Sequence, residues 1–515
     1  MSEEEPRSRT VAVIGAGLGG LATAIRLAAS GYDVTVFDSG PGPGGKANSR
    51  RLGPYRFDTG PSLFTMKPVF ERLFAAAGRR LEDYLTLIPL DEICRYFWSD
   101  GTRARTFANE ESIVEEFKRV FGEPPEHIDR YLRYSRRIHD ITAHLFLDHS
   151  LHEWSTVRAP GFLRSLFQVH RIDAFRTMAQ AHRRFFRDPR LQQLFNRYAT
   201  YNGSDPHRAP ATFNIIPHVE YGIGAWAVEG GIRAVPLAME RLARELGVTF
   251  RYGERVDRIV TDRIGPARPR GKRVVRGVRT DQGEFSAEIV VSNADVTVTY
   301  RDLLEDERER AFRRYSRMEP SSSGIVFLWG VRGIHRELGL HNILFSQDYR
   351  EEFRDIFNRR RMPEDPTIYI NITSRNGAPR DAPVDGENWF VLVNAPCDSG
   401  QDWRNEAERT RQAVIERVQG ELGIDLSGRI REEACMTPDE IEALTGATRG
   451  SLYGISSNSR SAAFRRHPNR SRRYRGLYFA GGSAHPGGGM PLVVSGGAIV
   501  ADLVSRYHPC TDLPE

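Results

Sequence analysis

The chain has 515 residues, of which 40% are apolar and 27% charged, and its net charge is +6 at pH 7, a composition typical of a globular protein of two or three domains. No apolar run approaches the roughly 18–20 residues of a membrane-spanning helix, and the acidic first residues lack the apolar stretch of a signal peptide. The cysteines are scattered without a Cys-x-x-Cys pair, which favours a reducing cytoplasm and indicates neither a disulfide framework nor a zinc site.

The first structural signal is a strand, a glycine-rich turn and a helix near the N-terminus. The apolar run Val11–Ile14 is followed by three glycines at G-x-G-x-x-G spacing: Gly15, Gly17 and Gly20. We expect the first to permit the turn, the second to let the backbone approach a phosphate, and the third to let helix and strand pack closely. A second strand at Val34–Phe37 ends in Asp38, which is placed to accept hydrogen bonds from an adenosine ribose. This pattern predicts a doubly wound, Rossmann-like α/β domain.

Glycines also dominate the segment after the second strand. Residues 42–47 read Gly-Pro-Gly-Gly-Lys-Ala and include Gly45 and Lys46. Such glycines leave the backbone free to run along a cofactor, and Lys46 could meet a phosphate or a ribityl group. Taken alone, the segment could also be a surface turn.

The middle of the chain changes character twice. Residues 105–225 are rich in helix formers, arginine and aromatic residues, which favours a helical lid. Strand-like runs then return the chain to the first domain, and the last two, 273–279 and 284–292, are joined by a hairpin turn at residues 281–283. Residues 300–455 alternate strands with helices, including a long charged helix at 403–422, and predict a second, sheet-based domain.

A second glycine-rich signature follows near the C-terminus. Residues 476–492 read as a strand, a glycine loop containing Gly482, Ser483 and His485, and the start of a helix. A nicotinamide site needs only the first signature, whereas a long FAD lying across a domain needs backbone contacts from both ends of the chain. The pairing therefore predicts FAD, and no metal site is expected. His485 could be catalytic, or it could be a structural histidine bonded to nearby backbone.

These signals predict three parts. The first is a discontinuous FAD-binding domain of residues 1–105, 225–300 and 455–515. The second is a helical, membrane-facing insertion of residues 105–225, and the third is a substrate domain of residues 300–455.

The chain resembles the phytoene-desaturase-like carotenoid desaturases, a branch of the amine-oxidase-like flavoproteins. The resemblance is carried by residues 11–70 and by four later segments, Asn196–Pro206, Glu229–Val235, Val290–Asp295 and His485–Leu492. The His-Pro-Gly-x-Gly-x-Pro tail is the most specific part, and Tyr-Asn-Gly-Ser-Asp-Pro most resembles bacterial 3,4-desaturases of hydroxylated or cyclised carotenoids. The chain departs from the family at Asp38, where Glu is usual, and at Gly482, where Asp or Ala is common.

The resemblance implies FAD contacts at matching positions. Val256 would hold the adenine through its backbone, Asn293 would lie near the cofactor, and the helix beginning near Pro491 would aim its N-terminus at the flavin pyrimidine edge. Ser62 and Leu63 would border the flavin. The full set of predicted FAD-binding residues is Gly15, Gly17, Gly20, Asp38, Gly45, Lys46, Ser62, Leu63, Val256, Asn293, Gly482, Ser483, Met490, Pro491 and Leu492.

The resemblance also implies a reaction. A desaturase of this family extends the conjugation of a C40-type carotenoid, possibly at the 3,4 bond. It transfers a hydride from one allylic carbon to the flavin and removes a proton from the neighbouring carbon. An acceptor such as oxygen or quinone would take up the electrons, and no nucleic acid is an expected partner. Two alternatives stay open: a carotenoid isomerase or saturase of the same fold, and a non-catalytic carotenoid-binding or delivery protein.

A water-insoluble substrate has to be collected at a bilayer. The positive net charge is either the product of codon bias or an attraction to anionic lipid. We expect peripheral binding to the inner face of the cell membrane through an aromatic, arginine-rich part of the insertion. Its residues are Phe162, Leu163, Arg164, Phe167 and Arg171. In the competing interpretation these side chains form the core of the lid.

Overall fold

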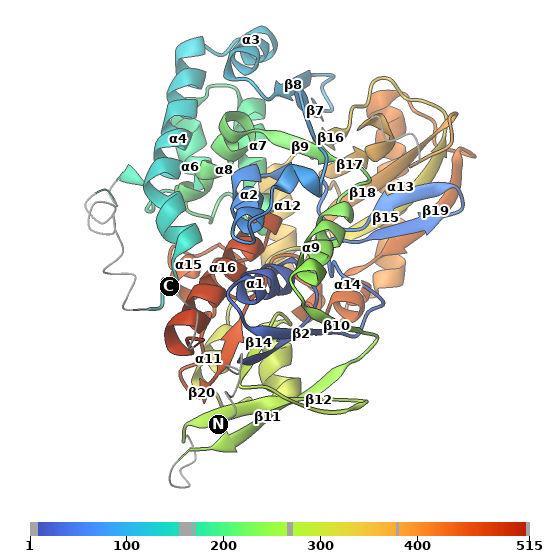
Figure 1. Cartoon of the computed structure of the whole chain (residues 1–515). Helices are drawn as coiled ribbons and strands as arrows, with labels where there is room; N and C mark the ends of the chain where they lie inside the picture. The colour runs from blue at the N-terminus through green and yellow to red at the C-terminus, as the bar shows by residue number, and fades with distance from the viewer. Residues whose placement is uncertain (1–8, 154–167, 169–170, 265–270, 377–380, 511–515) are drawn as a thin grey trace, which may run out of the picture.

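The computed structural model describes residues 9–153, 168, 171–264, 271–376 and 381–510 (Figure 1). The molecule is built around two large β-sheets. Most of the described part of the insertion, residues 105–225, is helical. Among the described residues, no helix is both long enough and apolar enough to cross a membrane.

The first sheet has five parallel strands in the order β10-β2-β1-β14-β21. Their bounds are Thr249–Tyr252 (β10), Asp33–Asp38 (β2), Thr10–Ile14 (β1), Ile289–Ser292 (β14) and Leu477–Phe479 (β21). Strands from both ends of the chain therefore lie side by side, with β14 between β1 and β21. The predicted Rossmann-like α/β fold is confirmed.

The two faces of this sheet pack against different elements, because successive side chains along a strand point to opposite faces. Val11 and Val13 of β1 pack against helices α1 (Leu18–Ala29), α9 (Ala234–Glu245) and α16 (Met490–Tyr507). Ala12 and Ile14 pack instead against a small antiparallel sheet of β11 (Val256–Arg263), β12 (Arg273–Thr280) and β13 (Gly283–Ser286). Much of the second face is thus covered by strands rather than by helices.

One predicted strand is divided between two sheets. The run 284–292 was expected to be continuous, but β13 ends at Ser286 and pairs with β12, whereas β14 begins at Ile289 and pairs with β1. The chain crosses from one layer to the other at Ala287 and Glu288. The predicted hairpin turn between β12 and β13 is present, with Thr280 opposite Gly283.

The second sheet has seven strands in the order β19-β15-β18-β17-β16-β7-β8. Their bounds are Ile430–Met436, Ser323–Arg332, Gly386–Ala395, Ile368–Ile372, His341–Leu344, Glu92–Phe97 and Arg103–Phe107. Ile325, Phe327 and Trp329 pack against α13 (Trp403–Leu422) on one face, and the other face is turned toward the first domain. We expected residues 1–105 in the first domain, but pairing places β7 and β8, which begins at Arg103, in this sheet.

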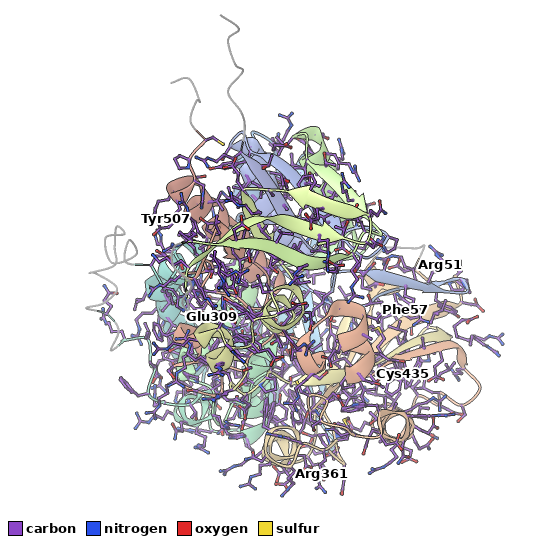
Figure 2. The ribbon with its side chains drawn as sticks, turned by 90° about the horizontal axis from the view of Figure 1, so that it is seen from below. Arg51, Phe57, Glu309, Arg361, Cys435 and Tyr507 are labelled. Carbon is purple, nitrogen blue, oxygen red and sulfur yellow. The ribbon has the colours of Figure 1, made fainter. Side chains whose placement is uncertain are left out.

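The described part of the insertion is mostly helical, as expected. It contains α3 (Glu110–Phe121), α4 (Pro125–Asp148), α6 (Met178–Phe185), α7 (Pro189–Asn196) and α8 (Ile216–His218), together with the short turns η4 (Arg197–Asn202), η5 (Ala211–Ile215) and η6 (Val219–Ile223). Thr177 and Gln180 form a capping box at the start of α6. Figure 2 shows Tyr507, at the end of α16, and Cys435 of β19 on opposite sides of the molecule.

The remaining elements connect these layers. They are β3 (Ser49–Leu52), β4 (Tyr55–Asp58), β5 (Phe64–Thr65), α2 (Lys67–Ala75), η1 (Leu81–Asp83), β6 (Leu87–Pro89), β9 (Ala225–Val228), α10 (Val296–Val298), η7 (Thr299–Leu303), α11 (Arg310–Tyr315), α12 (Tyr349–Arg354), η8 (Asp355–Arg359), η9 (Thr373–Asn376), α14 (Pro438–Thr445), η10 (Thr448–Gly450), α15 (Ala462–Arg465) and β20 (Tyr474–Arg475).

Candidate active site

A cavity of about 1820 Å³ is lined by residues of the parallel sheet, the second sheet and the helical insertion. Ordinary small-molecule pockets occupy roughly 300–1,000 Å³. The cavity is therefore large enough for a long cofactor together with a second long ligand.

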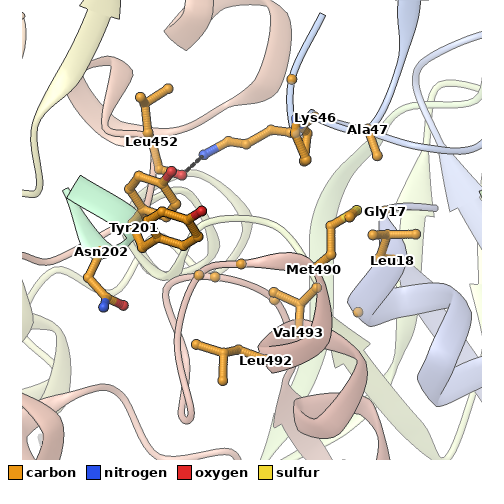
Figure 3. A pocket seen from close by; sticks show the side chains of 18 of the residues that line it. Gly17, Leu18, Lys46, Ala47, Tyr201, Asn202, Leu452, Met490, Leu492 and Val493 are labelled. Atoms are coloured by element: carbon orange, nitrogen blue, oxygen red, sulfur yellow. Dashed lines mark hydrogen bonds between the residues drawn. The ribbon is translucent and has the colours of Figure 1, made fainter. Parts of the chain in front are cut away.

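Two helix N-termini meet at this cavity. Gly17 is the N-cap of α1 and Gly489 is the N-cap of α16, and both residues line the cavity. Figure 3 shows Gly17 and Leu18 at the start of α1, with Met490 at the start of α16 beside them. Helix N-termini present unpaired N–H groups and a partial positive charge, which together bind anions. This arrangement fits the pyrophosphate of a dinucleotide.

The side chain of Asn293 lies where the two glycine loops approach each other. Its Nδ2 donates to the carbonyl of Gly15 at 3.3 Å. A Cβ atom at Gly19 would lie 2.7 Å from Asn293 Oδ1 and 2.9 Å from the backbone nitrogen of Gly481. A Cβ atom at Gly17 would lie 2.8 Å from Asn293 Nδ2, so Gly17 has a steric role within the protein besides its predicted approach to phosphate. The glycines are needed because two distant segments of the chain touch here.

The Asp38 carboxylate shapes the turn that it borders. Its Oδ2 accepts a hydrogen bond from the backbone nitrogen of Ala16, and its Oδ1 accepts one from Gly40, each at 2.7 Å. Each carboxylate oxygen can accept more than one hydrogen bond, so the group retains capacity for a ribose hydroxyl. Asp38 lines the cavity, which keeps the predicted ribose contact geometrically open.

Most of the predicted FAD-binding residues lie together on the cavity wall. They are Gly15, Gly17, Asp38, Gly45, Lys46, Ser62, Leu63, Val256, Asn293, Gly482, Met490, Pro491 and Leu492. Gly20 and Ser483 are not among the lining residues. A Cβ atom at Gly20 would lie 2.1 Å from the carbonyl oxygen of Gly15, and Ser483 Oγ accepts a hydrogen bond from the backbone of Val296 at 3.0 Å. These two act on the packing around the site.

The ammonium group of Lys46 is already engaged by the protein. Its Nζ donates to the carbonyl oxygens of Ser451 and Leu452, each at 3.0 Å (Figure 3). Desolvation lowers the pKa of Lys46 to about 8, and the carboxylate of Asp295 opposes that shift. Lys46 therefore joins the 42–47 loop to the segment before the C-terminal signature, and only one of its three N–H groups is left for the predicted cofactor contact.

His485 lies behind the cavity wall. Its side chain is fully buried, its Nε2 lies 3.0 Å from the carbonyl oxygen of His149, and Phe146, which does line the cavity, packs edge-on against its ring. Burial lowers the pKa of His485 to about 3. This geometry supports the structural interpretation of His485 over the catalytic one.

Arg466 is a cavity-lining residue that the sequence patterns did not indicate. Its side chain is 3% exposed, its Nη1 has no hydrogen-bond partner, and no described carboxylate forms a salt bridge with it. A Cβ atom at Gly487 would lie 2.6 Å from its Cζ, so the glycine lets the guanidinium pack against the C-terminal loop. An unpaired buried cation is costly, which fits an anionic cofactor in the cavity. One arginine among many carries no sequence signal.

The other part of the cavity has apolar walls and a buried polar patch. Apolar walls are contributed by the second sheet, for example Val326 and Phe390, and by the insertion, for example Ile141 and Phe213. The polar patch consists of Arg197, Glu220, His341 and Tyr369, all of which line the cavity. Sequence patterns did not predict this patch, because its members come from separate elements.

Comparisons with known proteins agree with this arrangement. The model of the family described as flavin containing amine oxidoreductase matches residues 18–505. The chain is 39% identical to a 1-hydroxycarotenoid 3,4-desaturase of a Flavobacterium species, over 96% of this chain and 99% of that protein. It is 34% identical to a 4,4'-diaponeurosporene oxygenase of Staphylococcus aureus, over 97% of this chain and 98% of that protein.

Solved structures share the fold at low sequence identity. An engineered putrescine oxidase is 15% identical with a TM-score of 0.60, over 97% of this chain and 99% of that one. A fatty acid isomerase from P. acnes is 15% identical with a TM-score of 0.58, over 98% of this chain and 99% of that one. This likeness concerns the architecture alone.

Proposed function

The chain belongs to the flavin containing amine oxidoreductase family, and we propose that it is an FAD-dependent carotenoid desaturase acting at the 3,4 bond of a hydroxylated carotenoid. The observation that carries the proposal is one cavity that joins two helix N-termini to a compartment with largely apolar walls. The first end suits a dinucleotide and the second suits a polyene. The hydroxylated substrate is taken from the printed activity of the Flavobacterium relative.

Some residues of the cavity would bind FAD, and others would align the polyene and exclude water. FAD, when bound, supplies the hydride acceptor. The N-termini of α1 and α16, Asp38 and Arg466 would hold its polar parts. The apolar walls would align the polyene and keep water from the positive charge that develops as a hydride leaves carbon.

Expression in carotenoid-producing cells tests the reaction. We expect cells that make a 1-hydroxylated acyclic carotenoid to accumulate a product with one more conjugated double bond, seen as a red-shifted absorption spectrum and a mass lower by two hydrogens. A product of unchanged mass would instead indicate isomerisation. No new pigment across a wide substrate panel, from protein that retains FAD, would indicate a binding or delivery role.

We also propose that the cavity opens toward a membrane surface. Phe464 lines the cavity and is 65% exposed, and Arg460, which also lines it, lies over the ring of Phe175, itself 70% exposed. Exposed aromatic groups beside arginines suit the interface of an anionic bilayer. Of the docking residues predicted from the sequence, Phe162, Leu163, Arg164 and Phe167 lie outside the described residues, and Arg171 is exposed.

A further inference from the structure

The polar patch of the substrate compartment is out of place in a cavity for a pure hydrocarbon. Arg197, Glu220 and His341 are 8%, 1% and 4% exposed, so they have lost nearly all contact with water. A polyene chain offers them no hydrogen bond, and desolvated polar groups are costly when they are left without partners. Arg197 and Glu220 form an ion pair at 3.7 Å, and Arg197 also donates to the Tyr96 hydroxyl at 2.9 Å. The atoms of the patch that stay unpaired therefore call for a ligand that carries a polar group.

The hydrogen bonds of His341 define its tautomer. Asn371 Nδ2 donates to the carbonyl of Leu340 at 3.0 Å, which sets the orientation of the amide, and the same nitrogen lies 3.2 Å from His341 Nδ1. An N–H on Nδ1 would face the N–H of that amide, so we assign Nδ1 as the acceptor of the hydrogen bond from the Tyr369 hydroxyl at 2.7 Å, with Asn371 Nδ2 beside it. Burial lowers the pKa of His341 to about 3, so the ring is neutral and its single proton is on Nε2.

Nε2 of His341 has no hydrogen-bond partner among the described residues. Besides Arg466, two other cavity-lining residues share this condition: Nε of Arg197 and the hydroxyl of Tyr349 are also buried without a partner. The charge of Arg197 acts on both His341 and Tyr349, since it further lowers the first pKa and opposes the rise of the second. These groups therefore belong to one electrostatic neighbourhood.

The carboxylate of Glu220 already has donors within the protein. One of its oxygens accepts a hydrogen bond from Tyr198 at 2.6 Å and the other accepts one from Tyr201. Of the unpaired groups, Nε of Arg197 and Nε2 of His341 are N–H donors, and the Tyr349 hydroxyl can also donate. The ligand that completes the patch must supply an oxygen that accepts hydrogen bonds.

We propose that His341 is a specificity-determining residue, whose Nε2–H donates to the hydroxyl oxygen on the end group of the carotenoid; this inference rests on the proposed function. Tyr369 connects the site to the predicted flavin border, because its hydroxyl lies 2.6 Å from Ser62 Oγ. In a 1-hydroxycarotenoid the oxygen-bearing carbon is two bonds from carbon 3. An oxygen held at His341 would therefore hold the 3,4 bond close to that border.

Selectivity between two matched substrates tests the proposal. The purified, FAD-loaded enzyme is assayed with a 1-hydroxylated acyclic carotenoid and with the same carotenoid lacking the hydroxyl. We expect kcat/KM to favour the hydroxylated substrate by at least about tenfold, because a carotenoid without the hydroxyl leaves the buried donors unpaired. In His341→Phe, which keeps an aromatic ring but has no donor, this ratio should approach one. His341→Gln, which retains an N–H donor, should restore part of the preference.

Several outcomes would overturn the proposal. One is a wild-type enzyme that uses both substrates equally, and another is a His341→Phe variant that loses activity on both substrates by the same factor. Carotenoid binding, followed by absorbance shifts in detergent, is measured in parallel and does not need turnover. Tighter binding of the hydroxylated carotenoid by the wild type but not by His341→Phe would support the His341 contact even where desaturation fails. Equal binding of the two carotenoids by the wild type would refute it.

Discussion

Gly20 gives the sharpest test of how the dinucleotide turn is built. In Gly20→Ala the new Cβ atom would lie 2.1 Å from the carbonyl oxygen of Gly15 and 3.3 Å from Asn293 Cβ. Ordinary carbon contacts lie near 3.5–4.0 Å, so α1 would have to move away from β1 by more than about 1 Å. That movement is opposed on the far side, where a Cβ atom at Gly497 of α16 would already lie 2.7 Å from Ala22 Cβ.

We expect the substitution to cost about 1–3 kcal/mol of stability and to release flavin, because the strain falls on the turn that lines the cavity. Gly420→Ala is the matched control, since Gly420 is exposed in the last turn of α13 and nothing lies within 4 Å of the added Cβ. It should be neutral or stabilise by about 0.5–1 kcal/mol. Flavin content of the purified protein and thermal unfolding followed by flavin fluorescence are the measurements. A Gly20→Ala protein with a full flavin complement and an unchanged melting temperature would refute the packing argument.

Four further changes test the site and its surroundings. Asp38→Ala should raise the Kd for FAD at least about tenfold, measured by fluorescence titration, because it removes two backbone hydrogen bonds and the predicted ribose contact. Arg466→Met should weaken FAD binding by a similar factor in the same titration if its unpaired charge faces the cofactor, and undiminished affinity would contradict that role. The stability of the wild-type protein should fall as the pH drops from 6.5 towards 3, because His485 is protonated in the unfolded chain whereas burial lowers its pKa in the folded protein to about 3. His485→Gln, which keeps an N–H donor, should lose less stability over this pH range in acid-unfolding experiments. Phe464→Ser combined with Phe175→Ser should reduce flotation with anionic liposomes, and undiminished flotation of an FAD-loaded double variant would rule out this docking surface.

Local signals in the sequence were sufficient for much of the first domain and for isolated helices. The glycine spacing and the flanking apolar runs predicted β1, α1 and β2, since a tight turn before a helix leaves few alternatives. The long helix predicted at 403–422 has those bounds in the structure, because Asp402 caps its start and Gly423 adopts a left-handed conformation at its end.

Only the tertiary structure decided which strands pair and which polar groups meet. The division of 284–292 into β13 and β14, and the addition of β7 and β8 to the second sheet, depend on pairing between segments far apart in the chain, which no local pattern encodes. For the same reason, no sequence pattern predicted a role for Arg466 or His341. An arginine or a histidine becomes distinctive only when folding removes it from water and leaves one of its nitrogens without a partner. The sequence by itself determined the glycine turns, because they need a particular backbone conformation or a close approach that a side chain would prevent. The polar groups of the substrate compartment could be identified only from the tertiary structure, because burial and hydrogen-bond partners are properties of the packed chain.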